Sequence, residues 1–171
     1  MTDALATQLV SLCAERNVRL ATAESCTGGL IAAAITDVPG SSAVLDRGFV
    51  TYSNEAKGDM LNVSPELIES VGAVSSEVAG RMALGALSRS HADLSVAVTG
   101  IAGPGGGTAE KPVGLVYLAI AKRFEDEAML LTERRLMLAD TFERDGRSGV
   151  REETRRIALQ TLVDAVALER P

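Results

Sequence analysis

The sequence predicts an α/β protein, a three-layer α/β/α sandwich around a mostly parallel five-stranded sheet with one antiparallel strand. Three observations lead to this prediction. Short apolar runs of strand length alternate with helical patterns along most of the chain. The run 94–98 is mostly apolar and lies between Asp93 and Thr99, as in a strand buried on both faces. The last two runs, 113–121 and 129–137, have a short connection and therefore predict a hairpin.

The first elements follow in order from local signals. Residues 3–16 place leucines and Cys13 on one face at helical spacing, so the chain opens with an amphipathic helix. The apolar run 18–23 predicts the first strand, and the alanine-rich segment 28–35 predicts a short helix packed against the sheet. Residues 47–53 are rich in β-forming side chains and predict the second strand.

Helical signals dominate the middle and the end of the chain. Residues 54–61 predict a short helix directly after the second strand. Ser64 and Pro65 supply the cap and the first-turn proline of another helix, which runs to about residue 70. A longer helix begins at Ser75, and the amphipathic pattern of 150–168 predicts the C-terminal helix.

Length and charge limit the possible functions. A chain of 171 residues, 46% hydrophobic and 23% charged, predicts one globular domain spanning residues 1–171. The formal net charge of −6 gives no overall attraction to nucleic acid or to an anionic membrane, so an anionic ligand must be held by a local site. The N-terminal residues show no signal-peptide pattern and no run approaches the length of a membrane span, so we expect a cytoplasmic protein.

Metal-binding side chains are scarce. The two cysteines, Cys13 and Cys26, are too few and too poorly spaced for a metal knuckle or a disulfide framework. The single histidine, His91, is expected at the far end of a helix, away from the carboxyl ends of the strands. A metal site built from several cysteines or several histidines is therefore not expected.

Three polar segments follow predicted strands. They are 24–29, 52–57 and 99–107. Ligands of open α/β sheets bind at the carboxyl ends of the strands, so we expect these segments to meet there.

Ser25 is the favoured nucleophile in the first of these segments. A serine hydroxyl needs a base within hydrogen-bond reach, and Lys57 is better placed than His91 to be that base. Its pKa, about 10.4 for a free lysine, would have to be lowered by burial or by a nearby cation. The alternative is that Ser25 only caps a helix and Lys57 is a solvated surface lysine. Cys26 is the rival nucleophile, but a residue directly after Ser25 is expected to point away and to fill a buried position.

The glycine-rich segment 100–107 matches neither a P-loop nor a dinucleotide-binding motif. Its backbone N–H groups can still approach a phosphate or an oxyanion closely, and it follows a buried strand directly, so we expect a binding loop. Thr99, at the end of that strand, is placed to contact a ligand. An arginine cluster between Arg144 and Arg156 could supply one phosphate clamp for an anionic substrate.

Three segments together resemble the CinA C-terminal domain family, the nicotinamide-nucleotide amidohydrolases. They are 23–29 (Ala-Glu-Ser-Cys-Thr-Gly-Gly), 52–57 (Tyr-Ser-Asn-Glu-Ala-Lys) and 99–107 (Thr-Gly-Ile-Ala-Gly-Pro-Gly-Gly-Gly), which continues to 110–114 (Glu-Lys-Pro-Val-Gly). The resemblance covers nearly the whole chain. In longer relatives this domain follows one similar to molybdopterin-binding proteins, so the present sequence resembles the stand-alone deamidase.

The resemblance implies hydrolysis of nicotinamide mononucleotide to nicotinic acid mononucleotide and ammonia, a step of pyridine nucleotide recycling, without a metal or a cofactor. It implies Ser25 as the nucleophile and Lys57 as its base, with Tyr52 and Thr99 assisting orientation or proton transfer. The implied substrate-binding residues are Glu24, Thr27, Gly28, Gly100, Gly103, Gly105, Gly106 and Arg147. Arg151 is the alternative to Arg147, because the family's Gly-Asp-Arg order reads Asp-Gly-Arg at 145–147. N–H groups at the start of the helix after Ser25 are expected to stabilise the oxyanion.

Other functions stay open at this point. One is a non-catalytic nucleotide-sensing or partner-binding module of the same fold, and another is an amidase for a different carboxamide. The expected ligand is a small mononucleotide, with no nucleic acid and no membrane as partner. The hydrophobic C-terminal helix and the resemblance both lead us to expect a homodimer.

Overall fold

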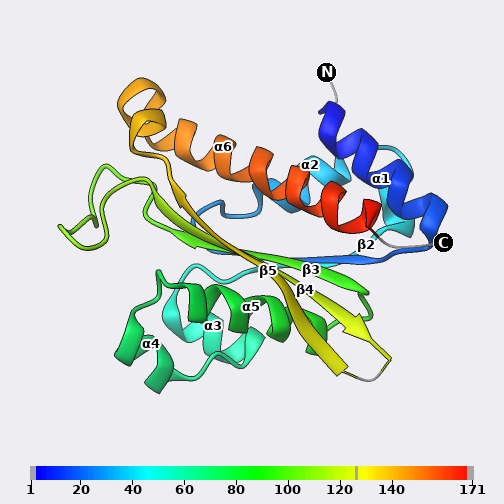
Figure 1. Cartoon of the computed structure of the whole chain (residues 1–171), viewed down its shortest axis with the longest axis horizontal. Helices are drawn as coiled ribbons and strands as arrows, with labels where there is room; N and C mark the ends of the chain where they lie inside the picture. Colours follow the sequence, from blue (N-terminus) through cyan, green and yellow to red (C-terminus); the bar gives the residue numbers. More distant parts are fainter. Residues whose placement is uncertain (1–2, 126, 169–171) are drawn as a thin grey trace.

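A five-stranded sheet forms the middle layer of the molecule (Figure 1). The computed structural model describes residues 3–125 and 127–168. In chain order the strands are β1 (Leu20–Glu24), β2 (Leu45–Val50), β3 (Leu94–Gly100), β4 (Leu115–Phe124) and β5 (Glu127–Met137). All five expected strands are present, and their order across the sheet is β2-β1-β3-β4-β5.

The pairing of the strands differs from the expected mostly parallel sheet. β1 pairs in parallel with both β2 and β3, whereas β4 pairs antiparallel with both β3 and β5. The antiparallel ladders are also the longer ones, so the expectation of a mostly parallel sheet is wrong. A parallel neighbour needs a long crossover, usually with a helix, and no helix lies between β3 and β4 or between β4 and β5 in the described residues. Because β4 runs opposite to the other strands from an inner position, it contributes two antiparallel ladders.

Helices cover both faces of the sheet, as the sandwich prediction requires (Figure 1). One face carries α1 (Ala4–Arg16), α2 (Leu30–Thr36) and α6 (Ala139–Ala167). The other face carries α3 (Asn54–Leu61), α4 (Pro65–Val71) and α5 (Ser76–Ser88), and a short 3₁₀ helix (Ser41–Ala43) precedes β2. Within the described ranges, no helix combines the length and the apolarity needed to cross a membrane.

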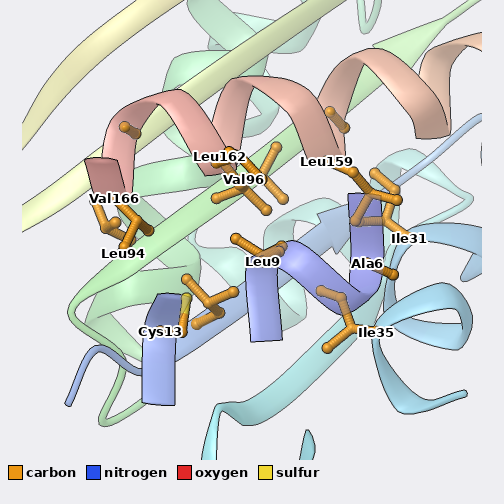
Figure 2. Packing of buried hydrophobic residues seen from close by; sticks show 14 of the residues in the cluster. Ala6, Leu9, Cys13, Ile31, Ile35, Leu94, Val96, Leu159, Leu162 and Val166 are labelled. Atoms are coloured by element: carbon orange, nitrogen blue, oxygen red, sulfur yellow. The ribbon is translucent and has the colours of Figure 1, made fainter. Parts of the chain in front are cut away.

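The two faces of the sheet have different cores. Figure 2 shows the first, where Leu9 of α1 and Leu162 of α6 pack with Val96 of β3. On the other face the sheet presents mainly alanines, and α5 faces them with further small residues. Gly85 of α5 lies so close to the Leu61 carbonyl that a Cβ atom would collide with it. The small side chains therefore bring α5, and with it the adjoining α3, close to the sheet.

The C-terminal helix is longer than expected. It begins at Ala139 rather than at residue 150, and it is broken at Gly146, whose φ of 65° and ψ of −158° are not helical. The polar, glycine-containing stretch 143–149 is typical of a loop, which is why periodicity places the helix start too late. The break matters for function because Arg147 follows it directly.

Candidate active site

The turn after β1 fixes Ser25 at the carboxyl end of the sheet. β1 ends at Glu24, and the Ser25 N–H donates to the Val98 carbonyl of β3 at 3.1 Å. The chain then turns through residues 26–29 before α2 begins. The Ser25 side chain is largely buried, and its hydroxyl lies in a small cavity.

Glu24 holds this turn against the start of α2. Its carboxylate is fully buried and accepts four hydrogen bonds, from the Thr27 hydroxyl at 2.7 Å and from the N–H groups of Gly29, Ile31 and Ala32 at 2.9–3.1 Å. Gly29, the N-cap of α2, has no side chain to cap the helix, so Glu24 supplies the missing acceptor. Glu24 and Thr27 therefore do not line the cavity. Glu24 occupies the N–H groups of Gly29, Ile31 and Ala32, so these three cannot also bind an oxyanion.

Lys57 is the immediate partner of Ser25. Its Nζ atom donates to Ser25 Oγ at 3.1 Å, to the Thr51 carbonyl at 2.8 Å and to the Ser53 carbonyl at 3.4 Å. Ser53 also caps α3 by accepting from the Ala56 N–H, and the helix holds Lys57 one turn further on. Lys57 is only 1% exposed, so the alternative of a solvated surface lysine is wrong.

Burial changes the chemistry of this lysine. Desolvation lowers the pKa of Lys57, and this effect outweighs the opposing charge of Cys26. A neutral amine has two N–H bonds and one lone pair. If the Thr51 and Ser53 carbonyls accept the two N–H bonds, the lone pair faces the Ser25 hydroxyl. The geometry therefore allows Lys57 to accept the serine proton.

The cavity has a volume of about 230 Å³. It lies where the segments after β1, β2 and β3 meet, together with the connection between α4 and α5 and the start of the second part of α6. Its lining residues are Ser25, Cys26, Tyr52, Asn54, Lys57, Ala73, Val74, Thr99, Gly100, Ala102 and Arg147. The expected meeting of three polar segments is thus present.

Two arginines of α6 have different positions. The Arg147 guanidinium donates to the Gly103 carbonyl and to the Tyr52 hydroxyl, each at 2.7 Å, and lines the cavity. Arg151 donates instead to the carbonyls of Cys26 and Thr27, at 3.1 and 2.9 Å. Arg147 is consequently the arginine that faces the site, and Arg151 holds the turn in place.

The glycine-rich loop contributes its beginning to the cavity. Gly100 and Ala102 line it, whereas Gly103 only approaches through its carbonyl, and Gly105 and Gly106 lie outside the lining. The remainder of the loop projects beyond the end of the sheet (Figure 1). The N–H groups of residues 102, 103 and 105–107 have no acceptor within the part of the chain that the structure describes, and Pro104 has no N–H. These backbone donors remain available to a ligand.

Other candidate residues make internal contacts, are buried or lie away from the cavity. The Thr99 hydroxyl lines the cavity but donates to the Ala73 carbonyl at 2.8 Å. Cys26 is buried in an apolar cluster, and burial raises the pKa of its thiol to about 12. Gly28 is placed beside Arg151 rather than in the cavity. His91 lies next to Asp46 at the start of β2, the opposite end of the sheet from Ser25.

Sequence reasoning missed four lining residues, Asn54, Ala73, Val74 and Ala102. Asn54 could have been found, since it precedes Lys57 by one helical turn and residues three apart share a helix face. Ala73 and Val74 come from a connection that carries no functional pattern. Over residues 3–125 and 127–168 there is no group of three or more metal-binding side chains that could hold an ion.

Comparison with known proteins gives consistent matches. The sequence model of the CinA C-terminal domain matches residues 2–166. A CinA-like protein of Chlorobaculum tepidum is 54% identical over 130 residues, which are 76% of this chain and 31% of that protein. A putative competence-damage inducible protein of Symbiobacterium thermophilum is 63% identical over 112 residues, 66% of this chain and 26% of that protein. This chain thus spans about a third or less of the length of these two relatives.

Solved structures match over almost their full length. The competence/damage inducible protein CihA from Agrobacterium tumefaciens superposes with a TM-score of 0.86 and 50% identity, covering 95% of this chain and 93% of that one. A CinA superfamily protein from Escherichia coli superposes with a TM-score of 0.84 and 33% identity, covering 96% and 90%.

Proposed function

Because the chain belongs to the CinA C-terminal domain family, we propose that it is a nicotinamide-nucleotide amidohydrolase. The proposed reaction hydrolyses the carboxamide of nicotinamide mononucleotide to nicotinic acid mononucleotide and ammonia. The observation that carries the proposal is the 3.1 Å contact between the buried Lys57 amine and the Ser25 hydroxyl. A serine next to a buried lysine is a nucleophile with its own general base.

The reaction proceeds through an acyl-enzyme. Neutral Lys57 takes the Ser25 proton while Oγ attacks the carboxamide carbon, and the carbonyl oxygen becomes an oxyanion. Lys57 then gives the proton to the amide nitrogen as the C–N bond breaks and ammonia leaves. Water attacks the resulting ester with Lys57 again as the base, which frees Ser25 and yields the carboxylic acid.

The oxyanion needs a donor other than the N–H groups that Glu24 already occupies. Ala102 lines the cavity, and its N–H has no acceptor within the described residues. We assign the stabilising donor to this N–H. A single such donor contributes about 3 kcal/mol to transition-state stabilisation.

The cavity size favours a substrate that enters only in part. Its 230 Å³ lie below the roughly 300 Å³ at which pockets for drug-sized ligands begin. The pyridine carboxamide fits inside, and the ribose and the phosphate then extend from the mouth along residues 103–107. Arg147 and the unpaired N–H groups of this loop supply positive charge and donors for the phosphate, in a protein of net charge −6.

Incubation with nicotinamide mononucleotide tests the proposal, with chromatography of the nucleotides and an ammonia assay. We expect product with the unaltered chain and a fall of about 10³-fold or more in the Ser25→Ala variant. Ser70→Ala, an exposed serine of α4, is the matched control and should keep full activity. Equal turnover by the Ser25→Ala variant would remove Ser25 from the mechanism. Nucleotide binding without any product would favour a non-catalytic sensing module instead.

A further inference from the structure

Asn54 occupies a position that the reaction above does not use. It is the first residue of α3 and lines the cavity together with Lys57, which follows one helical turn later. Residues three apart lie on the same face of a helix. Lys57 is buried, whereas Asn54 is exposed and also lines a second cavity with Glu55. The capping of α3 does not need Asn54, because the Ser53 side chain accepts from the Ala56 N–H at 3.0 Å.

The polar neighbours of Asn54 each have hydrogen-bond partners of their own within the protein. Lys57 binds Ser25 and two backbone carbonyls, the Thr99 hydroxyl donates to a carbonyl, and Arg147 binds a carbonyl and a hydroxyl. The Asn54 side chain has no hydrogen-bond partner within the described part of the chain. It therefore presents both an unused donor and an unused acceptor to the cavity.

We propose that Asn54 recognises the carboxamide of the substrate and discriminates against the carboxylic acid product. This inference rests on the proposed amidohydrolase function. A primary carboxamide presents an N–H donor beside a C=O acceptor, and the Asn54 side chain presents the complementary pair. Asn54 Nδ2 donates to the substrate carbonyl oxygen, and Oδ1 accepts from the substrate amide nitrogen.

The product cannot make the same pair of hydrogen bonds. A carboxylate has acceptors only, so one of its oxygens faces the Asn54 Oδ1 atom without a proton between them. Sites built to hydrogen-bond an N–H group reject ligands that lack it, because a polar group of the site is then left without a partner. Asn54 thereby favours binding of the amide and release of the acid.

Direct binding measurements test this inference in a Ser25→Ala background, which prevents turnover. The ligands for calorimetry are nicotinamide mononucleotide and nicotinic acid mononucleotide. With Asn54 present, the amide should bind about tenfold more tightly than the acid. Asn54→Leu should remove most of this preference by weakening the amide, and Asn54→Asp should weaken the acid by about a further tenfold. Asn54→Ala replaces the leucine variant if melting curves show that the latter is misfolded.

A structural role for Asn54 gives a different result, in which both ligands weaken equally in every variant. That outcome, or an unchanged preference, overturns the inference while ammonia release by the unaltered chain keeps the proposed function. If the Ser25→Ala chain binds neither nucleotide and the unaltered chain releases no ammonia, both proposals fail together. Glu55→Gln is the control, since Glu55 is the next residue of α3 and does not line this cavity.

Discussion

Two segments that each contribute lining residues to the cavity differ in how much of their hydrogen-bonding capacity the protein itself uses. The turn wall, residues 24–29, has its carboxylate bound by four donors and two of its carbonyls bound by Arg151. The loop wall, residues 100–107, has the Gly103 carbonyl bound by Arg147 and both backbone groups of Ile101 paired with residues 114 and 115. Its N–H groups from residue 102 onward are unpaired in the described structure.

This difference matches what each wall is proposed to do. A nucleophile is effective only when its geometry is held within a fraction of an ångström, and the internal hydrogen bonds of the turn wall provide that constraint for Ser25. A binding surface needs donors that are still available, and the loop wall provides them. The comparison predicts that substitutions in the turn wall or at Lys57 reduce catalysis or the stability of the fold. In the loop wall, the effect of a substitution should depend on whether the new side chain has room.

The largest effect is expected from Lys57→Met, which keeps an unbranched side chain one atom shorter and removes the base. We expect kcat/KM for nicotinamide mononucleotide to fall by about 10³-fold or more, because the nucleophile and its base act as a unit. Steady-state kinetics measures this fall. Activity within tenfold of the unaltered chain would contradict the role of Lys57 as the base.

The pH dependence sharpens the same test. Lys57 must be neutral to accept the serine proton, so activity should rise with pH through its lowered pKa, at a pH below the ordinary value of 10.5. The unfolded chain binds more protons than the folded one between these two pKa values. The free energy of unfolding of the unaltered chain should therefore rise with pH in that window relative to Lys57→Met. Urea unfolding at several pH values measures the difference, and parallel curves would contradict it.

Glu24 gives the next largest effect, on stability rather than on chemistry. Glu24→Ala leaves a buried hydroxyl and three N–H groups without their acceptor, and we expect a loss of about 3 kcal/mol in the free energy of unfolding. Glu24→Gln keeps the shape and should be intermediate. Urea unfolding at neutral pH measures both variants. Glu55 is exposed, and Glu55→Gln should change the free energy of unfolding by less than about 0.5 kcal/mol. A loss there equal to that of Glu24→Ala would contradict the stabilising role of the buried Glu24 carboxylate.

Much of the fold could be predicted because its signals are local. The apolar run at 94–98, for example, marks a strand wherever it pairs. Sheet pairing is not local, since the position of β4 between β3 and β5 depends on the path of the loop 101–114. The break at Gly146 was hidden for a related reason. Glycine and charged residues there are typical of a loop, and only packing shows that the helix continues on both sides.

In the site, too, some residues could be predicted from local signals and others could not. Ser25 and Lys57 could be paired by reasoning from strand ends and from the absence of a nearby histidine. Glu24 was expected to bind substrate because the family resemblance implied that role. The absence of a capping side chain at Gly29 was the available signal that the helix needed an acceptor from elsewhere. Nothing in the sequence shows whether this carboxylate binds a substrate or caps the helix.

The smallest effects are expected in the loop wall, where two glycines form a matched pair. Gly103 has a φ of 78°, and a Cβ atom there would lie 2.5 Å from Val113 Cγ1 and 2.6 Å from Phe142 Cε2. We expect Gly103→Ala to lower the free energy of unfolding by about 2 kcal/mol and to raise the KM, because the carbonyl that Arg147 binds moves with the loop. At Gly105 no heavy atom lies within 4 Å of such a Cβ, so Gly105→Ala should change stability by less than about 0.5 kcal/mol. Urea unfolding and steady-state kinetics on the two variants separate strain from recognition. If Gly105→Ala destabilises the chain as much as Gly103→Ala, the outer part of the loop is packed in solution, and its N–H groups are not the available donors that the comparison requires.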